Sequence, residues 1–199
     1  RTGCEAEAVT EAAEEARATR AAAEAQARRM GEVRTMLVRE LDLLKASMEK
    51  RDSALVVVAG FMSPSHDQYV RGKLKADAIP SDERLLMVRE ATRDHPFVSA
   101  HPWEVDQKGF RDFPQVSKAV KDEVDSKFCA DADDSTIKTY YLCGTDHMTK
   151  CGLTNGLRNG VGVVGVQREG ERLPKLPPNA AKKDVMLVKG DFASDASST

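Results

Sequence analysis

The hexapeptide Ala54-Leu55-Val56-Val57-Val58-Ala59 is a short apolar run rich in β-branched residues, and Gly60 follows it directly. A run of this kind predicts a buried strand of a parallel sheet. Later segments predict further strands at 96–99, 136–143, 161–166 and 185–188. Helical patterns separate them, with a helix start at Ser81 and a helix over 113–128. Strands that alternate with helices predict an α/β fold with a parallel sheet covered on both faces.

The N-terminal part of the chain differs in composition from the rest. Residues 1–30 are dominated by Ala, Glu and Arg, which favour a helix but supply almost no large apolar side chains. We expect a helical extension that projects from the domain or lies on a partner, with a disordered tail as the alternative. Apolar residues then recur at three- and four-residue steps as far as Met48, which predicts an amphipathic helix. The predicted organisation is an extension over 1–30 and an α/β domain over 31–199.

Composition excludes several classes of protein. The 199 residues are 41% hydrophobic and 31% charged, with a formal net charge of −2. This balance gives no general attraction to nucleic acid, and no apolar run reaches the roughly 20 residues of a membrane span. The cysteines lack C-x-x-C spacing, which predicts reduced thiols rather than a zinc site or a disulfide framework; they are Cys4, Cys129, Cys143 and Cys151. We expect a soluble protein of a reducing compartment, the cytosol or an organelle.

The first predicted strand ends in residues that suit nucleotide binding. Ligands of doubly wound sheets lie beyond the carboxyl ends of the strands, and Gly60 and Ser63 stand at this end. A glycine allows a ligand to approach the backbone closely, and Arg71 or Lys73 further on can meet a phosphate. Ordinary turn and surface roles are the alternative for each of these residues.

Two later segments have the same character. Gly144 and Asp146 follow the strand predicted at 136–143, and a carboxylate there can accept a hydrogen bond from a ribose hydroxyl. Ser197, Ser198 and Thr199 can offer hydroxyl and N–H groups to a phosphate at a helix start. Caps and turns are again the alternative.

Taken in order, these segments resemble the nicotinamide mononucleotide adenylyltransferase family in its eukaryotic branch. The matching segments are Gly60-Phe61-Met62-Ser63-Pro64 with Asp67 and Tyr69, Ile79-Pro80 with Arg84 and Met87, Trp103-Glu104, Cys143-Gly144-Thr145-Asp146 and Asp195-Ala196-Ser197-Ser198-Thr199. They are similar to the family motifs G-x-I-S-P-x-x-D-x-Y, I-P-x-x-x-R-x-x-M, W-E, C-G-A-D and D-I-S-S-T. The resemblance covers residues 35–199, with gaps.

The resemblance implies a Rossmann-like nucleotidyltransferase fold that joins ATP to nicotinamide or nicotinate mononucleotide, with Mg²⁺ accompanying the ATP if that activity is retained. Catalysis in the family rests on positioning and charge stabilisation. Arg71 falls at the position of a phosphate-facing lysine, and Phe110 at that of a tryptophan that stacks on the pyridine ring. The rest of the implied nucleotide-binding set is Gly60, Ser63, Lys73, Trp103, Gly144, Asp146, Ser197, Ser198 and Thr199.

The sequence departs from the family at the segment that holds the ATP phosphates. In the register of Gly60, the motif G-S-F-N-P-x-T-x-x-H falls on residues 29–38, which contain no Asn-Pro pair and have Val38 at the histidine position. The sequence also stops at Thr199, before the arginine of S-S-T-x-x-R. An alternative register makes Gly60 to His66 the first motif, but the later motifs fit only the register above.

Loss of a histidine and an arginine that stabilise the transition state would weaken catalysis without preventing nucleotide binding. We therefore expect a non-catalytic, adenylyltransferase-like accessory subunit of a larger, possibly organellar assembly, in which a protein partner covers an exposed sheet edge and the N-terminal helix. One alternative is a fragment of an active adenylyltransferase that makes NAD from ATP and nicotinamide or nicotinate mononucleotide. Another is a nucleotide sensor without turnover. No metal site is expected at His95, His101 or His147, since single histidines near turns usually serve as caps or surface residues.

Overall fold

The structure is a computed structural model that describes residues 17, 42, 44–50, 55–128, 137–167, 172–181 and 184–189. Predictions that fall elsewhere, including most of the extension over 1–30 and the segment Ser197 to Thr199, lie outside the described residues. No helix in the described ranges is long and apolar enough to cross a membrane.

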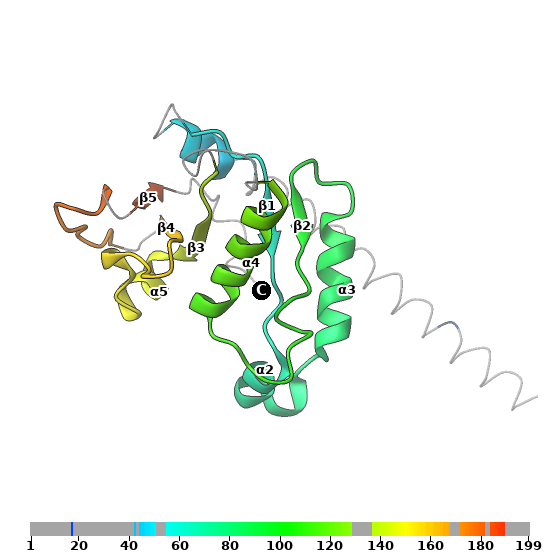
Figure 1. Ribbon diagram of the computed structural model, residues 1–199. Coiled ribbons are helices and arrows are strands. Elements are labelled where there is room, and N and C mark those ends of the chain that lie inside the picture. The colour runs from blue at the N-terminus through cyan, green and yellow to red at the C-terminus, as the bar shows by residue number, and fades with distance from the viewer. Residues whose placement is uncertain are drawn as a thin grey trace, which may run out of the picture.

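All the strands described pair in parallel, which confirms the α/β class (Figure 1). In one sheet β1 (Gly60–Met62) pairs with β2 (Val98–Ala100). The other sheet has β4 (Gly162–Gln167) between β3 (Tyr140–Gly144) and β5 (Val185–Lys189). The described residues thus form a two-stranded and a three-stranded sheet rather than the one predicted sheet.

The described residues contain the helices α2 (Asp67–Leu74), α3 (Ser81–Thr92), α4 (Phe113–Phe128) and α5 (Thr145–Lys150), besides a helical segment over 44–50. Two single 3₁₀ turns follow helices, η1 (Lys75–Asp77) and η2 (Leu153–Asn155). The predicted start at Ser81 and the predicted helix over 113–128 are confirmed. The apolar pattern does not predict α2 and α5, because both are short and α2 buries none of its residues.

The predicted strand at 54–59 is wrong in its position. Residues 55–59 have no regular structure, and the strand begins only at Gly60. The strand begins at Gly60 because its pairing partner β2 is only three residues long and lies opposite Gly60–Met62 alone. Val57 packs onto the other sheet, whereas Val56 and Val58 on either side are 71% and 70% exposed. The strand predicted from residue 136 likewise begins later, at Tyr140.

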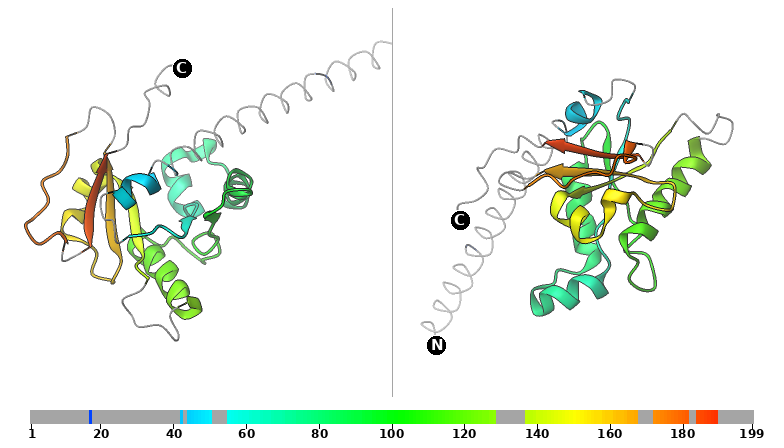
Figure 2. Two further views of the ribbon diagram at one scale, coloured as in Figure 1. Left: turned by 90° about the horizontal axis from the view of Figure 1, so that it is seen from above. Right: turned by 90° about the vertical axis from the view of Figure 1, so that its left-hand side faces the viewer.

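The three-stranded sheet has core residues on both of its faces. Figure 2 shows α5 on one side of this sheet and the helical segment 44–50 on the other. On one face α5 packs over Val163 and Val185, in a cluster that also contains Met148, Leu153 and Ala180. On the opposite face the helical segment 44–50 places Met48 against Val164 and Val188. Side chains alternate between the faces of a strand, and the neighbours Val163 and Val164, both fully buried, therefore belong to different clusters.

Helix α4 contacts both halves of the fold. On the side of β2, His101 Nε2 lies 2.9 Å from Glu123 Oε2. On the side of β4, the Asn159 side-chain amide donates a 2.8 Å hydrogen bond to the Pro114 carbonyl at the start of the helix. This helix therefore ties the two-stranded sheet to the three-stranded one.

Candidate functional site

The loop between β1 and α2 is held by a buried carboxylate. Glu104 is only 6% exposed, and its Oε1 accepts a 3.0 Å hydrogen bond from the His66 backbone N–H. Its Oε2 accepts a 3.4 Å hydrogen bond from the Ser63 hydroxyl. Burial raises the pKa of Glu104, against the effect of these hydrogen bonds. The predicted site residue Ser63 thus lies in a loop that Glu104 holds in place through two hydrogen bonds.

A guanidinium from α3 holds the same loop from another side. Arg84 donates to the Ser65 carbonyl at 2.5 Å and to Asp67 Oδ1 at 2.8 Å. It also donates to the Ile79 carbonyl at 2.8 Å, just before its own helix. Burial opposes ionisation of Asp67, but the hydrogen bond from Arg84 and the charge of Arg71 outweigh it and lower the pKa of this carboxyl. The loop is therefore pre-organised before any ligand arrives.

Two exposed aromatic rings stack beside this loop. Tyr69 on α2 and Phe110 lie with centroids 5.1 Å apart and an interplanar angle of 12°. Lys73 Nζ lies 4.3 Å from the centroid of the Tyr69 ring and also contacts its hydroxyl. The Phe110 N–H donates a 2.9 Å hydrogen bond to Gln68 Oε1, which fixes the ring on the helix. A pair of exposed aromatic side chains with a cation beside them suits an aromatic ligand that carries a phosphate.

The other predicted residues of this region have structural partners. Gly60 approaches β2 rather than an open cleft, because a Cβ on it would lie 3.2 Å from Val98 Cγ2. Arg71 forms a 3.1 Å ion pair with Asp67, but its side chain is 65% exposed and can turn toward a ligand. Trp103 is half-buried in the turn before Phe110.

A second group of predicted residues lies at the end of β3. Gly144 is the last residue of this strand and the N-cap of α5, and Asp146 lies in the first turn of that helix. Thr145 between them is almost fully buried. The strand thus passes directly into the helix, and Gly144 and Asp146 stand at the carboxyl end of a parallel strand, where ligands of α/β sheets bind.

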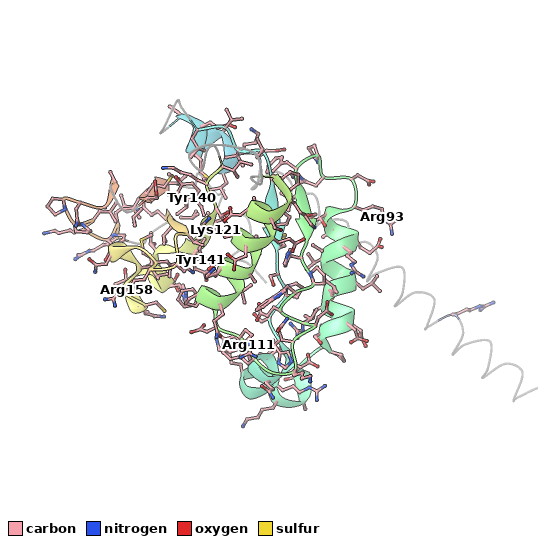
Figure 3. All side chains as sticks on the ribbon, in the orientation of Figure 1. Arg93, Arg111, Lys121, Tyr140, Tyr141 and Arg158 are labelled. Carbon is pink, nitrogen blue, oxygen red and sulfur yellow. The ribbon has the colours of Figure 1, made fainter. Side chains whose placement is uncertain are left out.

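Segment 110–113 connects the two groups. Phe110 stacks on Tyr69, while Phe113 stacks on Tyr141 with a centroid distance of 5.0 Å. Figure 3 shows Arg111, an exposed residue, near the start of α4, and Tyr141 between α4 and α5. Arg111 and Phe113 are not among the site residues that the sequence predicts. Phe110 and Phe113 are three residues apart, and this spacing does not reveal that the two rings stack on different partners.

One histidine has the expected capping role: His95 Nδ1 accepts hydrogen bonds from the N–H groups of Phe97 and Val98. His101 is instead only 6% exposed, and its Nε2 lies 2.9 Å from Glu123 Oε2. Within the described residues no group of three or more His, Cys, Asp or Glu side chains is placed to hold a metal ion. The cations on α2 near the loop after β1 are Arg71, which pairs with Asp67, and Lys73, which lies over the Tyr69 ring.

Comparison of the chain with models of protein families and with curated proteins gave no match.

Proposed function

We propose that the chain is a nicotinamide mononucleotide adenylyltransferase-like protein that serves as an accessory subunit of a larger assembly and does not catalyse the transfer itself. The ordered segments that resemble the family support this proposal. Three of them begin or end elements: Ser63 follows β1, Pro80 caps α3, and Gly144 caps α5. A Rossmann-like arrangement is the finer form of the α/β fold that we propose on the same ground.

The proposed accessory role rests on apolar side chains that are exposed on the parallel strands. Parallel strands are usually buried on both faces, yet Phe61 in the middle of β1 is 42% exposed. Leu142 in the middle of β3 is 41% exposed. Among the described residues β1 and β3 each pair with a single neighbouring strand. An unpaired edge with exposed apolar side chains favours the addition of another chain, and we infer that a protein partner covers these edges.

We infer the absence of adenylyl transfer from the sequence. Residues 29–38 lack the Asn-Pro pair and the histidine that the family uses at the ATP phosphates. Without a donor at the developing charge, the transition state of adenylyl transfer loses its main stabilisation. The stacked rings of Tyr69 and Phe110 favour a second candidate, which is binding of a pyridine nucleotide with or without turnover.

The accessory role is tested by the native size of the full chain in extracts of its own cells. We expect the wild-type chain to migrate in a large assembly, and Leu142→Ser or Phe61→Ser to release it as a free chain. Leu86→Ser is the matched control, because Leu86 is 57% exposed on α3, away from both strand edges. Migration of the wild type as a free monomer contradicts the proposal.

The catalytic question is tested on the purified chain by calorimetry and a product assay. ATP with Mg²⁺ and nicotinamide mononucleotide are titrated separately, and dinucleotide is then measured after mixing all three. We expect no dinucleotide. Formation of dinucleotide identifies an active adenylyltransferase and rejects the accessory role. Binding that Phe110→Ala removes, without product, identifies a nucleotide sensor.

A further inference from the structure

Three side chains on β3 and α5 form a line of polar contacts that the proposed function does not use. Cys151 Sγ lies 3.8 Å from His147 Nδ1, and His147 Nε2 lies 3.4 Å from the Tyr141 hydroxyl oxygen. The Phe113 ring packs against the Tyr141 and His147 rings, and its centroid lies 5.0 Å from the centroid of each. A nucleophile, a base in contact with it and a third group that orients the base is the arrangement of an activated nucleophile.

Two placements of the protons fit these contacts, and one of them leaves His147 Nδ1 free to accept the thiol proton. Burial raises the pKa of Tyr141, which remains a neutral phenol at physiological pH. With the His147 Nε2–H donating to the Tyr141 oxygen, Nδ1 keeps its lone pair and faces the Cys151 thiol. This nitrogen is then the acceptor for the thiol proton, and the thiolate is the reactive form of a cysteine.

The neighbouring cysteine provides a contrast on the same elements. Cys143 is half-buried against the core, and burial is the main cause that raises the pKa of its thiol to about 12. Cys151 is an exposed free thiol at the end of α5. Beside it, a Cβ placed on Gly152 would meet no atom within 4 Å. Open space therefore adjoins the Cys151 sulfur, which contacts His147. The Cys143 side chain, by contrast, packs against the core.

We propose that Cys151 is a thiol-modification site that exchanges with the disulfides of small thiols, with His147 as the base. The Cys151 proton passes to His147 Nδ1, and the thiolate attacks one sulfur of the disulfide. The disulfide S–S bond breaks as the new one forms, and the other half leaves as a thiolate that takes the proton from His147. Cys151 is thereby oxidised to a mixed disulfide, and the small disulfide is reduced to one thiol.

The test uses the full reduced chain and glutathione disulfide at pH 7, with acid quenching and mass spectrometry of each cysteine peptide. The reference is a synthetic peptide of residues 148–155, which carries Cys151 without His147. We expect Cys151 in the folded chain to react about tenfold faster than in the peptide, and Cys143 to stay unmodified. We expect His147→Gln to remove this advantage and Thr149→Ala, a change on the same helix outside the cluster, to keep it.

Equal rates for Cys151 in the folded chain and in the peptide overturn the proposal, as does an unchanged rate in His147→Gln. Modification of Cys143 in a variant reports that α5 has separated from the sheet. In that event the comparison of the folded wild-type chain with the peptide decides the matter alone, since it requires no variant.

Discussion

At the residue scale, Arg84 is the side chain on which the loop after β1 most depends. It donates to the Ser65 and Ile79 carbonyls and to Asp67, and its side chain is only 16% exposed. We expect Arg84→Ala to lower the free energy of unfolding by about 2 kcal/mol, because two partly buried acceptors, the Ser65 carbonyl and Asp67, and the exposed Ile79 carbonyl lose a charged donor. Arg84→Lys restores only part, since one ammonium cannot span all three.

Urea unfolding measures this effect, and Arg93→Ala is the control from the end of the same helix. The Arg93 side chain is 64% exposed and contacts only Glu90 among the ion pairs described. We expect its removal to change the free energy of unfolding by less than about 0.5 kcal/mol. Equal losses for the two alanine variants would contradict the role of Arg84.

Glu104 gives the fold a pH dependence of definite sign. Burial raises its pKa above the value in the unfolded chain, and the native state therefore holds its proton more tightly. The stability that this proton contributes is present at low pH and is lost as pH rises through the raised native pKa. We expect the free energy of unfolding of wild type relative to Glu104→Gln to fall between pH 4 and pH 7. A difference that stays constant over this range would show that burial of the carboxylate has no net effect.

The contacts of Glu104 also show what the sequence could not predict about the candidate site. The sequence predicts Ser63 and Gly144 from local patterns at strand ends, and Phe110 only from the resemblance to the adenylyltransferase family. It did not reveal what holds them, because Glu104 is 41 positions from Ser63 and 38 from His66. Hydrogen bonds of that separation leave no periodicity in the chain, and only the folded structure brings their partners together.

At the element scale, the close packing of β4 is the feature most sensitive to a small change. A Cβ on Gly162 would lie 2.5 Å from two ring carbons of Tyr140 and 2.8 Å from the Asp184 carbonyl oxygen. We expect Gly162→Ala to destabilise the fold by about 2 kcal/mol or more, because the backbone oxygen cannot move aside easily. Gly72→Ala on α2 should instead stabilise it by about 0.5–1 kcal/mol, since nothing lies within 4 Å and alanine favours a helix.

Thermal unfolding of the two alanine variants checks this pair. The opposite signs matter, because they separate steric crowding in a central strand from the general effect of replacing glycine. A Gly162→Ala variant as stable as the wild type would mean that β3, β4 and β5 pack less closely than described.

The elements differ in how well the sequence predicts them, for a physical reason. Helix α4 carries its own pattern, with apolar residues spaced along sixteen positions and a proline in the first turn, and its bounds follow from the sequence. Strand β1 carries no such information. Its bounds depend on the three residues of β2 that lie opposite, and the apolar run before it therefore extends beyond the paired region.

At the scale of the whole molecule, α4 decides whether the two sheets unfold together. It contacts the two-stranded side through Glu123 and His101, and the three-stranded side through Phe113 and Pro114. A two-stranded sheet of three-residue strands has little stability alone. We infer that the smaller sheet stays folded because α4 holds it to the larger one, and that the described residues behave as one cooperative unit.

Two probes, one on each side of α4, test this cooperativity. Trp103, the single tryptophan, reports the region after β2 by fluorescence, and Cys143 reports the core around β3 by pulsed alkylation. We expect both probes to give the same urea midpoint. We expect Phe113→Ala to lower the free energy of unfolding by about 2 kcal/mol as measured by either probe, because the ring packs on Tyr141 and His147. Exposure of Cys143 while the Trp103 signal remains native would mean that α4 does not couple the sheets. In that case the edges of β1 and β3 would belong to two separate units, each needing its own partner.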